Sequence, residues 1–587
     1  MPRASAFRIT EVALLTIAAM LYVLHFVHLR ADFPNRSPWP DWAKYTDEGW
    51  YGLAAIRHYQ LGHWNVPGDF NPAAALPVWP LLELVVFRFT GVSLVAARAL
   101  TVVVFGLILV CCYLLLRRWA AGNGAAPSGD SGRVRSLSPA IAALLLAASP
   151  FYFAFSRLAI LEPLMILLAL AALIVAQRAG AAVLATCGLR VIGDTRSIAQ
   201  RRAEVRMAAW SAGGGLLTVA MVLTKTTALF LLPAVGWMLW ASCAYRVRVM
   251  LRASAIAVAV AAAIWGGYML LFVRPRYMAD YRYLFSANAY TGITGATFWR
   301  VLVDTFLAGK YLGATFFFVG VAAVALLLGC LAVRRFRRDG LVVSLLLWVF
   351  FYFAFLAYHD NLQARYYQAV GVPLAMLIAM GLDRLWRLSF GREAAGLGPG
   401  RKPRATQAMA AAASLLIAFI AVRGAWQSVG FAMHPEYTFL SAVNQVHDAI
   451  ERQRAEDRAA GRPVHPEMVL SISGAEMQLM TGLPSICDDF GTMSLPDRIA
   501  AYKPGWFLAW NDVEDDKMEA LAPMYRLVRA GAWPAFDDPD RNLTILYRLD
   551  PVASPGRGNS RNRRKLRVPR RLQTKVGEQP DLRQLEH

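Results

Sequence analysis

Two adjacent carboxylates, Asp47 and Glu48, lie among aromatic residues in the run Tyr45-Thr46-Asp47-Glu48-Gly49-Trp50-Tyr51. On a helix, neighbouring side chains point about 100° apart, so only one of the two can face a given cleft while the other orients or caps. A carboxylate in such a cleft can act as a general base that accepts the proton of an attacking hydroxyl or amine. A solvated helix N-terminus, where acidic side chains interact well with the helix dipole, is the plainer alternative.

Two more charged residues border apolar stretches. Glu162 follows Arg157 at a short turn, and an ionisable group so close to hydrocarbon is costly unless it is paired or lines a wet cavity. Glu162 is therefore a candidate functional residue, and an ion pair with Arg157 is the structural alternative. Lys225 also interrupts two apolar stretches, where its ammonium group can hold a phosphate or simply extend to the membrane interface.

The segment 358–367 contains one Lys or Arg, which is Arg365. Its planar guanidinium suits a phosphate or pyrophosphate. The tyrosines that follow, Tyr366 and Tyr367, can stack on a sugar, although a place in the aromatic belt of the membrane boundary is the commoner role. The histidines and cysteines show no metal-ligand spacing, so the sequence identifies neither a metal site nor a cofactor.

The elements that must position these residues are membrane spans. The chain has 587 residues, of which 57% are hydrophobic and 17% charged, and this excludes a disordered chain and an ordinary soluble enzyme. Apolar stretches of about 17 to 25 residues, long enough to cross a bilayer, recur up to about residue 424. The sequence predicts a polytopic α-helical membrane protein with about eleven spans, at residues 9–29, 93–116, 139–156, 158–177, 208–224, 226–244, 253–273, 311–333, 341–357, 368–386 and 408–424.

Basic residues predict the orientation of these spans. Most Lys and Arg of the loops fall on one side together with Arg3 and Arg8, and cations beside a span resist translocation. The N-terminus is therefore predicted to be cytoplasmic, and the first span to be retained because it lacks a small-residue cleavage site. An odd number of spans places the C-terminal region outside. The net charge of +22 then needs no nucleic acid to explain it.

Three domains are expected. Residues 1–433 form the membrane domain, whose first outer loop, 30–92, is too long to be a mere connector and is predicted to contain short interfacial helices. Residues 434–550 hold 19 Asp/Glu against 11 Lys/Arg, with strand patterns near 469–472 and 543–547 and a helix near 439–454, which predicts a small extracytoplasmic α/β domain. Residues 551–587 are basic and polar, typical of a disordered tail.

Together these features resemble the family 39 glycosyltransferases of the GT-C fold, a family that includes protein mannosyltransferases and the bacterial lipid A aminoarabinose transferases. The resemblance covers roughly residues 10–424. It is carried by Thr46-Asp47-Glu48 in the first outer loop, the Pro-rich apolar stretch 75–82, Ala97-Arg98, Ser149-Pro150, Ser156-Arg157 with Glu162, Leu223-Thr224-Lys225 and Arg365-Tyr366.

Membership of this family implies an enzyme that moves a sugar from a polyprenyl-phosphate carrier to an acceptor on the outer side of the membrane. By this resemblance Asp47 is the catalytic base, Glu48 supports it, and Glu162 is the second acidic residue of the site. Donor binding is assigned to Arg365, Lys225, Arg157, Tyr366 and Tyr45. The sequence shows nothing like the β-trefoil domain of eukaryotic mannosyltransferases, which favours the bacterial inner membrane and a cell-envelope acceptor such as lipopolysaccharide.

Two other functions remain open from the sequence. A polytopic transporter or lipid flippase also places charges among membrane helices, and a non-catalytic scaffold could use its outer domain to recruit envelope partners. The long first outer loop, the charges gathered near one face of the membrane and the soluble outer domain favour the enzyme.

Overall fold

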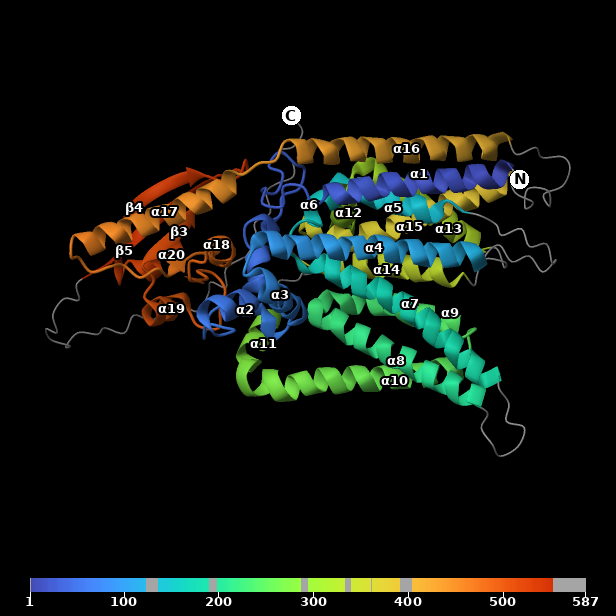
Figure 1. Ribbon diagram of the computed structural model, residues 1–587, viewed down its shortest axis with the longest axis horizontal. Coiled ribbons are helices and arrows are strands. Elements are labelled where there is room, and N and C mark those ends of the chain that lie inside the picture. Colours follow the sequence, from blue (N-terminus) through green and yellow to red (C-terminus); the bar gives the residue numbers. More distant parts are fainter. Residues whose placement is uncertain are drawn as a thin grey trace.

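A bundle of long helices with a small domain at one end makes up the molecule (Figure 1). The computed structural model describes residues 2–122, 136–188, 198–286, 294–332, 339–359, 362–390 and 404–552. Within these ranges, nine helices are long and apolar enough to cross a membrane. The predicted polytopic helical membrane protein is therefore confirmed. The nine spans lie in α1 (Pro2–Leu24), α4 (Leu94–Gly122), α7 (Leu161–Gly188), α8 (Ile198–Thr224), α10 (Val247–Tyr268), α13 (Ala314–Ala332), α14 (Gly340–Tyr358), α15 (Gln368–Phe390) and α16 (Arg404–Met433).

Two of the predicted spans are shorter than expected. The range 139–156 is broken, because Ser149 takes an extended conformation (ψ 124°) before Pro150, as the residue before a proline commonly does. It forms α5 (Ser138–Ala148) and the short α6 (Pro150–Phe155). The range 226–244 begins with the 3-10 helix η3 (Thr226–Leu231), which leads into α9 (Leu232–Ser242). All eleven predicted ranges thus correspond to apolar helical segments among the described residues, but two fall short of full spans.

Near residue 270 the bundle departs from regular α-helix. After α10 the chain continues through the π-helical segment η4 (Met269–Tyr277) into α11 (Met278–Ser286). Pro275 lies inside this segment, and a proline there removes a hydrogen-bond donor and favours such a distortion. The next described helices are α12 (Phe298–Ala308) and the 3-10 helix η5 (Gly309–Leu312).

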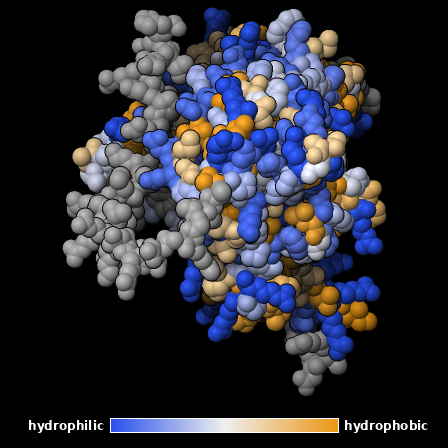
Figure 2. Space-filling model, turned by 90° about the vertical axis from the view of Figure 1, so that its left-hand side faces the viewer, coloured by the Kyte–Doolittle hydropathy of each residue, from blue (hydrophilic) through white to orange (hydrophobic). Residues whose placement is uncertain are grey.

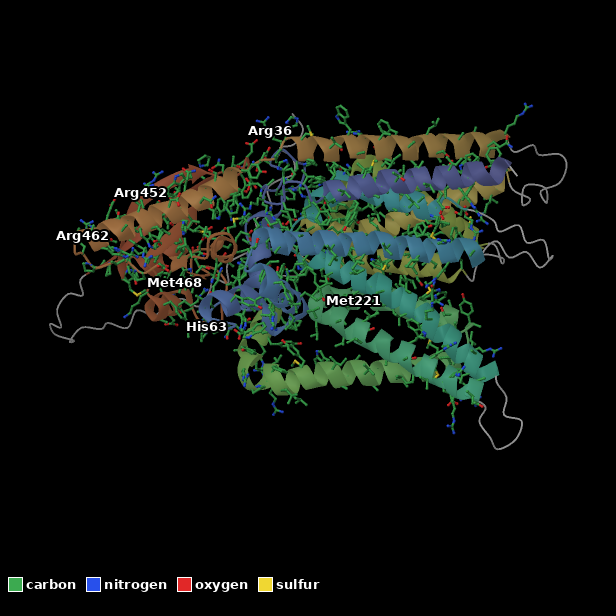
Figure 3. All side chains as sticks on the ribbon, viewed as in Figure 1. Arg36, His63, Met221, Arg452, Arg462 and Met468 are labelled. Carbon is green, nitrogen blue, oxygen red and sulfur yellow. The ribbon has the colours of Figure 1, made fainter. Side chains whose placement is uncertain are left out.

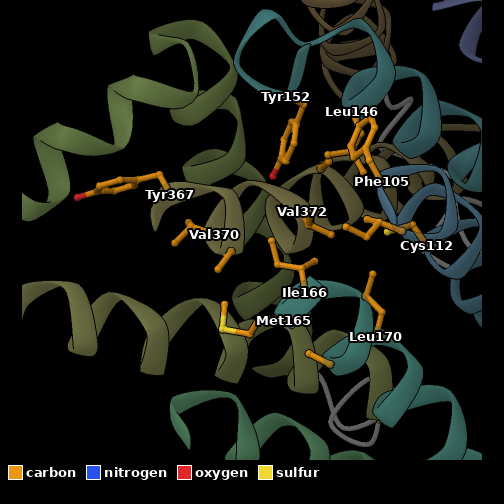
Figure 4. Close-up of a cluster of buried hydrophobic side chains, with 14 of the residues drawn as sticks. Phe105, Cys112, Leu146, Tyr152, Met165, Ile166, Leu170, Tyr367, Val370 and Val372 are labelled. Atoms are coloured by element: carbon orange, nitrogen blue, oxygen red, sulfur yellow. The ribbon is translucent and has the colours of Figure 1, made fainter. Parts of the chain in front are cut away.

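The core of the bundle surrounds α15. In the apolar window of α15, 83% of the residues are buried, against 6% in α1, so α15 is central and α1 peripheral. Side chains of α4, α6, α7 and α15 meet around Tyr152 (Figure 4). The Tyr152 hydroxyl donates to the Gln368 carbonyl (2.7 Å), and Trp348 Nε1 donates to the Ala369 carbonyl (2.7 Å). These bonds fix the first turn of α15, directly after the 3-10 helix η6 (Ala364–Tyr367) that carries Arg365.

The predicted first outer loop, residues 30–92, lies between the bundle and the small domain (Figure 1). It contains the helices α2 (Asp47–Leu61) and α3 (Val78–Thr90), with the 3-10 turns η1 (Trp42–Lys44) and η2 (Pro72–Ala74). Leu81, Val85 and Phe89 of α3 are exposed, whereas Trp79 and Phe87 on its other face are buried. This amphipathic pattern suits a helix at the membrane interface.

The C-terminal domain is a five-stranded mixed sheet with helices, in the strand order β2-β1-β3-β5-β4. Strands β1, β2 and β3 are parallel, and β5 pairs antiparallel with both β3 and β4. The predicted α/β domain is confirmed. The elements are α17 (Thr438–Ala459), β1 (Val469–Leu470), α18 (Gly474–Thr481), β2 (Ser485–Ile486), α19 (Leu495–Tyr502), β3 (Trp506–Trp510), α20 (Asp515–Leu521), β4 (Tyr525–Pro534) and β5 (Leu543–Pro551).

The surfaces of the two parts differ in character. The end of the molecule formed by the C-terminal domain is largely hydrophilic (Figure 2), as expected of a domain in water. Arg452 and Arg462 lie on the part of this domain that points away from the bundle, whereas Met221 lies within the bundle (Figure 3). Of the tail predicted to be disordered, residues 553–587 lie outside the described residues.

A buried charge network joins the first outer loop to the C-terminal domain. Arg57 of α2 and Arg498 of α19 both pair with Asp69, and each of the three side chains is about 1% exposed. Asp69 Oδ1 accepts the Cys487 N–H (2.9 Å), and Arg57 donates to the Ser485 carbonyl (3.0 Å). The domain is therefore held on the loop by contacts that water does not reach.

Replacing Asp69 should weaken this docking. Asp69→Ala leaves two guanidinium groups buried without their carboxylate, and breaking a buried pair in this way costs about 3–5 kcal/mol. We expect the apparent melting temperature of the purified protein in detergent to fall by several degrees, measured by intrinsic fluorescence. Arg36→Ala, which removes an exposed partner of Asp537, is the control and should melt like the wild type. Equal melting of all three proteins would contradict this account of the network.

Candidate active site

Arg365 lies at the centre of a buried cluster of charges. Its guanidinium pairs with Asp41, its Nη2 lies 2.9 Å from Asp47 Oδ2, and its Nε lies 3.7 Å from Glu162 Oε1. The Arg365 backbone N–H also donates to Asp41 Oδ2 (2.9 Å). Arg365 and the three carboxylates are at most 4% exposed. The cluster joins the first outer loop, the start of α7 and the turn before α15.

Lys225 adds a second cation to this cluster. The residue has an extended backbone between α8 and η3. Its ammonium group pairs with Glu162 and lies 4.4 Å from the centre of the Tyr366 ring, while the Arg365 guanidinium lies 4.9 Å from the same ring. Such cation–π contacts are favourable at buried sites. The structure thus brings together five residues that were singled out from the sequence: Asp47, Glu162, Lys225, Arg365 and Tyr366.

The charge balance of the cluster affects what it can bind. The carboxylates of Asp41, Asp47 and Glu162 face the two cations Arg365 and Lys225. Each cation already has an acidic partner, so an incoming phosphate must compete with a carboxylate for it.

Among the described residues, no group of three or more His, Cys, Asp or Glu side chains is arranged to hold a metal ion.

Asp47 has the features of a general base. Thr46 Oγ1 donates to Asp47 Oδ1 (3.0 Å), and Oδ2 accepts no hydrogen bond from the described residues, although it lies close to Arg365. Burial raises the pKa of Asp47, and the positive charge of Arg365 opposes this effect. A carboxylate whose pKa lies above its usual range accepts a proton more readily near neutral pH.

Glu48 points away from Asp47 into a different ion pair. The Arg98 guanidinium of α4 donates to both Glu48 oxygens (2.8 and 2.5 Å), and the Ala159 N–H donates to Oε1 (2.8 Å). Arg98 also donates to the backbone carbonyls of Leu29 and Ala31. Glu48 therefore ties α2 to α4 and to the turn before α7, so any support it gives to Asp47 acts through the position of the helix.

Arg157 and Tyr45 lie in other surroundings. Arg157 donates to the carbonyls of Val27 (2.7 Å) and His28 (2.6 Å), and its guanidinium stacks over Phe153. Glu162 pairs with Lys225 and Arg365, so the structure does not form the Arg157–Glu162 ion pair that the sequence left open.

Tyr45 belongs to the packing of the C-terminal domain. It is 3% exposed, and its ring meets Trp510 edge-on with 5.5 Å between ring centres. The Arg541 guanidinium lies 5.1 Å from the centre of the same ring. A direct role of Arg157 or Tyr45 in donor binding stays a prediction.

Sequence reasoning missed two residues of the cluster. Asp41 resembles an ordinary helix cap, because its Oδ1 accepts the Ala43 N–H at the start of η1. Its bond to Arg365, 324 residues away, leaves no trace in the local sequence. Tyr51 is the second: burial raises the pKa of its hydroxyl, the negative charge of Asp47 adds to this shift and Arg365 opposes it. It lies four residues after Asp47, and the helical i,i+4 spacing could have placed it on the same face.

The comparisons with known proteins bear on the fold. No model of a known protein family matches the chain, and no curated protein matches its sequence. Among solved structures, the Archaeoglobus fulgidus oligosaccharyltransferase in the apo form matches with a TM-score of 0.50 and 14% identity, over 93% of this chain and 75% of that one. ArnT from Cupriavidus metallidurans matches with a TM-score of 0.47 in the apo state (14% identity, 93% of this chain and 98% of that one) and bound to undecaprenyl phosphate (15%, 91% and 97%). At these identities the likeness concerns the fold alone, and the predicted GT-C architecture is confirmed.

Glu48 and Asp47 should respond differently to substitution. Glu48→Ala leaves the Arg98 guanidinium buried without its carboxylate, which costs about 3–5 kcal/mol. Asp47→Asn keeps the size of the side chain, and Asp47 accepts fewer hydrogen bonds than Glu48 does. We expect the Glu48 variant to lose thermal stability, measured by size-exclusion chromatography after heating, and the Asp47 variant to resemble the wild type. A stable Glu48→Ala protein would contradict the structural role assigned to this residue.

Proposed function

We propose that this chain is a membrane glycosyltransferase that moves a sugar from a polyprenyl-phosphate donor to a cell-envelope acceptor, such as lipopolysaccharide, another glycan or a protein. The observation that supports it most is the buried cluster around Arg365, where a candidate base and two candidate phosphate-binding cations meet at the end of the membrane helices. The fold, shared with an oligosaccharyltransferase, is in keeping with this reaction.

Lys225 and Arg365 hold the phosphate of the donor in this proposal. Negative charge develops on the phosphate oxygen as the bond to the sugar breaks, and cations in a site without water stabilise that charge strongly. Tyr366 packs against both cations and keeps them close together. The polyprenyl chain extends along the apolar helices, whose surfaces match it in polarity.

Asp47 is the base. In the structure it lies against Arg365, so a donor phosphate that binds Arg365 competes with this contact and frees the carboxylate. Asp47 then takes the proton of the acceptor hydroxyl, the acceptor oxygen bonds to the anomeric carbon, and the electron pair of the broken bond leaves with the polyprenyl phosphate. This single displacement inverts the anomeric configuration.

Asp47→Asn should abolish sugar transfer without unfolding the protein. The purified protein would be incubated with a panel of labelled polyprenyl-phosphate sugars and envelope fractions, and label in the acceptor would be measured. We expect a loss of at least about a hundredfold, the usual effect of removing a general base. Asp304→Asn, a matched change on the surface of α12, should remain active.

Each other outcome has a distinct meaning. Full activity of the Asp47 variant would refute the assignment of the base. Movement of the lipid across vesicles without transfer of label would favour a transporter or flippase, and complete inactivity of the wild type with the whole panel would favour a scaffold. A product with retained anomeric configuration would exclude the single displacement.

The proposal also places the C-terminal domain outside the inner membrane of a bacterium and the N-terminus in the cytoplasm. Glu519→Cys in α20 and Arg248→Cys near the start of α10 put thiols at exposed positions of the two predicted sides. We expect an impermeant maleimide to label the cysteine at position 519 in intact spheroplasts, and the cysteine at 248 only after lysis. The opposite pattern would overturn the orientation, and a cysteine-free background is the control.

A further inference from the structure

The helix that carries Asp47 receives no side-chain cap from its own N-cap residue. The first N–H groups of any helix have no partner within the helix and need another acceptor. Thr46 occupies the N-cap position of α2 but makes no capping hydrogen bond, and the Trp42 carbonyl (2.8 Å) and Asp47 Oδ1 (3.0 Å) compete for its single hydroxyl hydrogen. The first turn of α2 is buried, so water cannot supply the missing acceptors.

A residue of the C-terminal domain supplies this cap. The Gly49 N–H donates to Glu476 Oε2 (2.7 Å), across a sequence separation of 427 residues. Glu476 lies in α18 and is fully buried. Its carboxyl group therefore acts on the first turn of α2, two residues from Asp47.

Close packing holds α18 on this turn. A Cβ atom added to Gly49 would lie 2.2 Å from the Ala475 carbonyl carbon, so at this position only glycine lets the two backbones approach. The next residue, Trp50, donates from its indole Nε1 to the Ile472 carbonyl (3.2 Å). Two successive residues of α2 are thus held by the segment that follows β1.

The charged groups that affect the pKa of Glu476 are Glu48, Arg98 and Asp47. Burial raises the pKa of Glu476 well above its usual value, with a further contribution from Glu48, while Arg98 opposes the shift. A neutral carboxyl still accepts the Gly49 N–H through its carbonyl oxygen and adds no negative charge beside the base. Glutamine reproduces this arrangement and alanine does not.

We infer that the C-terminal domain completes the active site, with Glu476 as a positioning residue that caps the helix carrying Asp47. Sugar transfer then requires the domain to be docked on α2. The part of this inference that concerns activity rests on the proposed function, whereas the capping contact can be measured without it.

Three variants of the full-length protein test this role. Glu476→Ala should lower kcat about tenfold or more, because small displacements of a reacting group are costly, with the donor KM within about twofold of wild type. Glu476→Gln should stay within about threefold of wild type in both constants. Asp448→Asn, an exposed change on α17 of the same domain, is the matched control and should behave as wild type.

Hydrogen–deuterium exchange of the peptide containing residues 45–56 gives a readout that does not depend on activity. We expect several-fold faster exchange in the Glu476→Ala protein and unchanged exchange in Glu476→Gln, since the capping acceptor is lost only in the former. If the alanine variant does not fold, Glu476→Asp takes its place. The aspartate side chain is one methylene shorter, so its carboxyl group lies farther from the Gly49 N–H, and exchange should be faster than in the wild type by a smaller factor.

Several results would overturn the inference: wild-type exchange in Glu476→Ala, an equal loss of kcat in the glutamine and alanine variants, or an effect on KM alone. If the wild type transfers no sugar with any donor, the proposed function fails, and the exchange experiment still decides whether Glu476 caps α2.

Discussion

Burial of charge at the ends of the membrane helices is the constraint on which the candidate site depends. A guanidinium or ammonium group taken out of water is costly unless opposite charges contact it. Arg365 meets this condition through Asp41, Asp47 and Glu162, and Lys225 through Glu162 and the ring of Tyr366. Because these partners come from different elements, the helices that supply them must be held firmly, which the tight packing around α15 provides.

The helix α2 contacts the charge cluster, the helix bundle and the C-terminal domain. Asp47 faces the charge cluster, Glu48 binds Arg98 of α4, and Gly49 contacts α18 of the C-terminal domain. Successive residues on a helix point in different directions, so one turn can contact the charge cluster, the bundle and the C-terminal domain at once. The buried pair of Arg57 and Asp69, at the other end of α2, holds the domain on the same helix.

Much of the architecture could be predicted from the sequence, because apolar stretches of the length of a bilayer leave few alternatives to membrane helices. The same reasoning picked out Glu162 and Lys225, because an ionisable group so close to hydrocarbon is costly unless it is paired. Asp47 was picked out by its neighbouring carboxylate and Arg365 as the single basic residue of the segment 358–367. The break between α5 and α6 shows where this reasoning was too coarse. A hydropathy pattern continues through Ser149 and Pro150, whereas the backbone hydrogen bonds do not.

The sequence by itself determined the helices, the C-terminal α/β domain and the types of residue available for chemistry, because these follow from local composition and periodicity. Only the tertiary structure decided the partners. Asp41 reaches Arg365 across 324 residues, and Glu476 reaches Gly49 across 427. Helix geometry already implied that Asp47 and Glu48 point apart, but only the packing decided that Asp47 meets Arg365 and Glu48 meets Arg98. Pairing of this kind depends on how the elements pack in space, and no local pattern of residues encodes it.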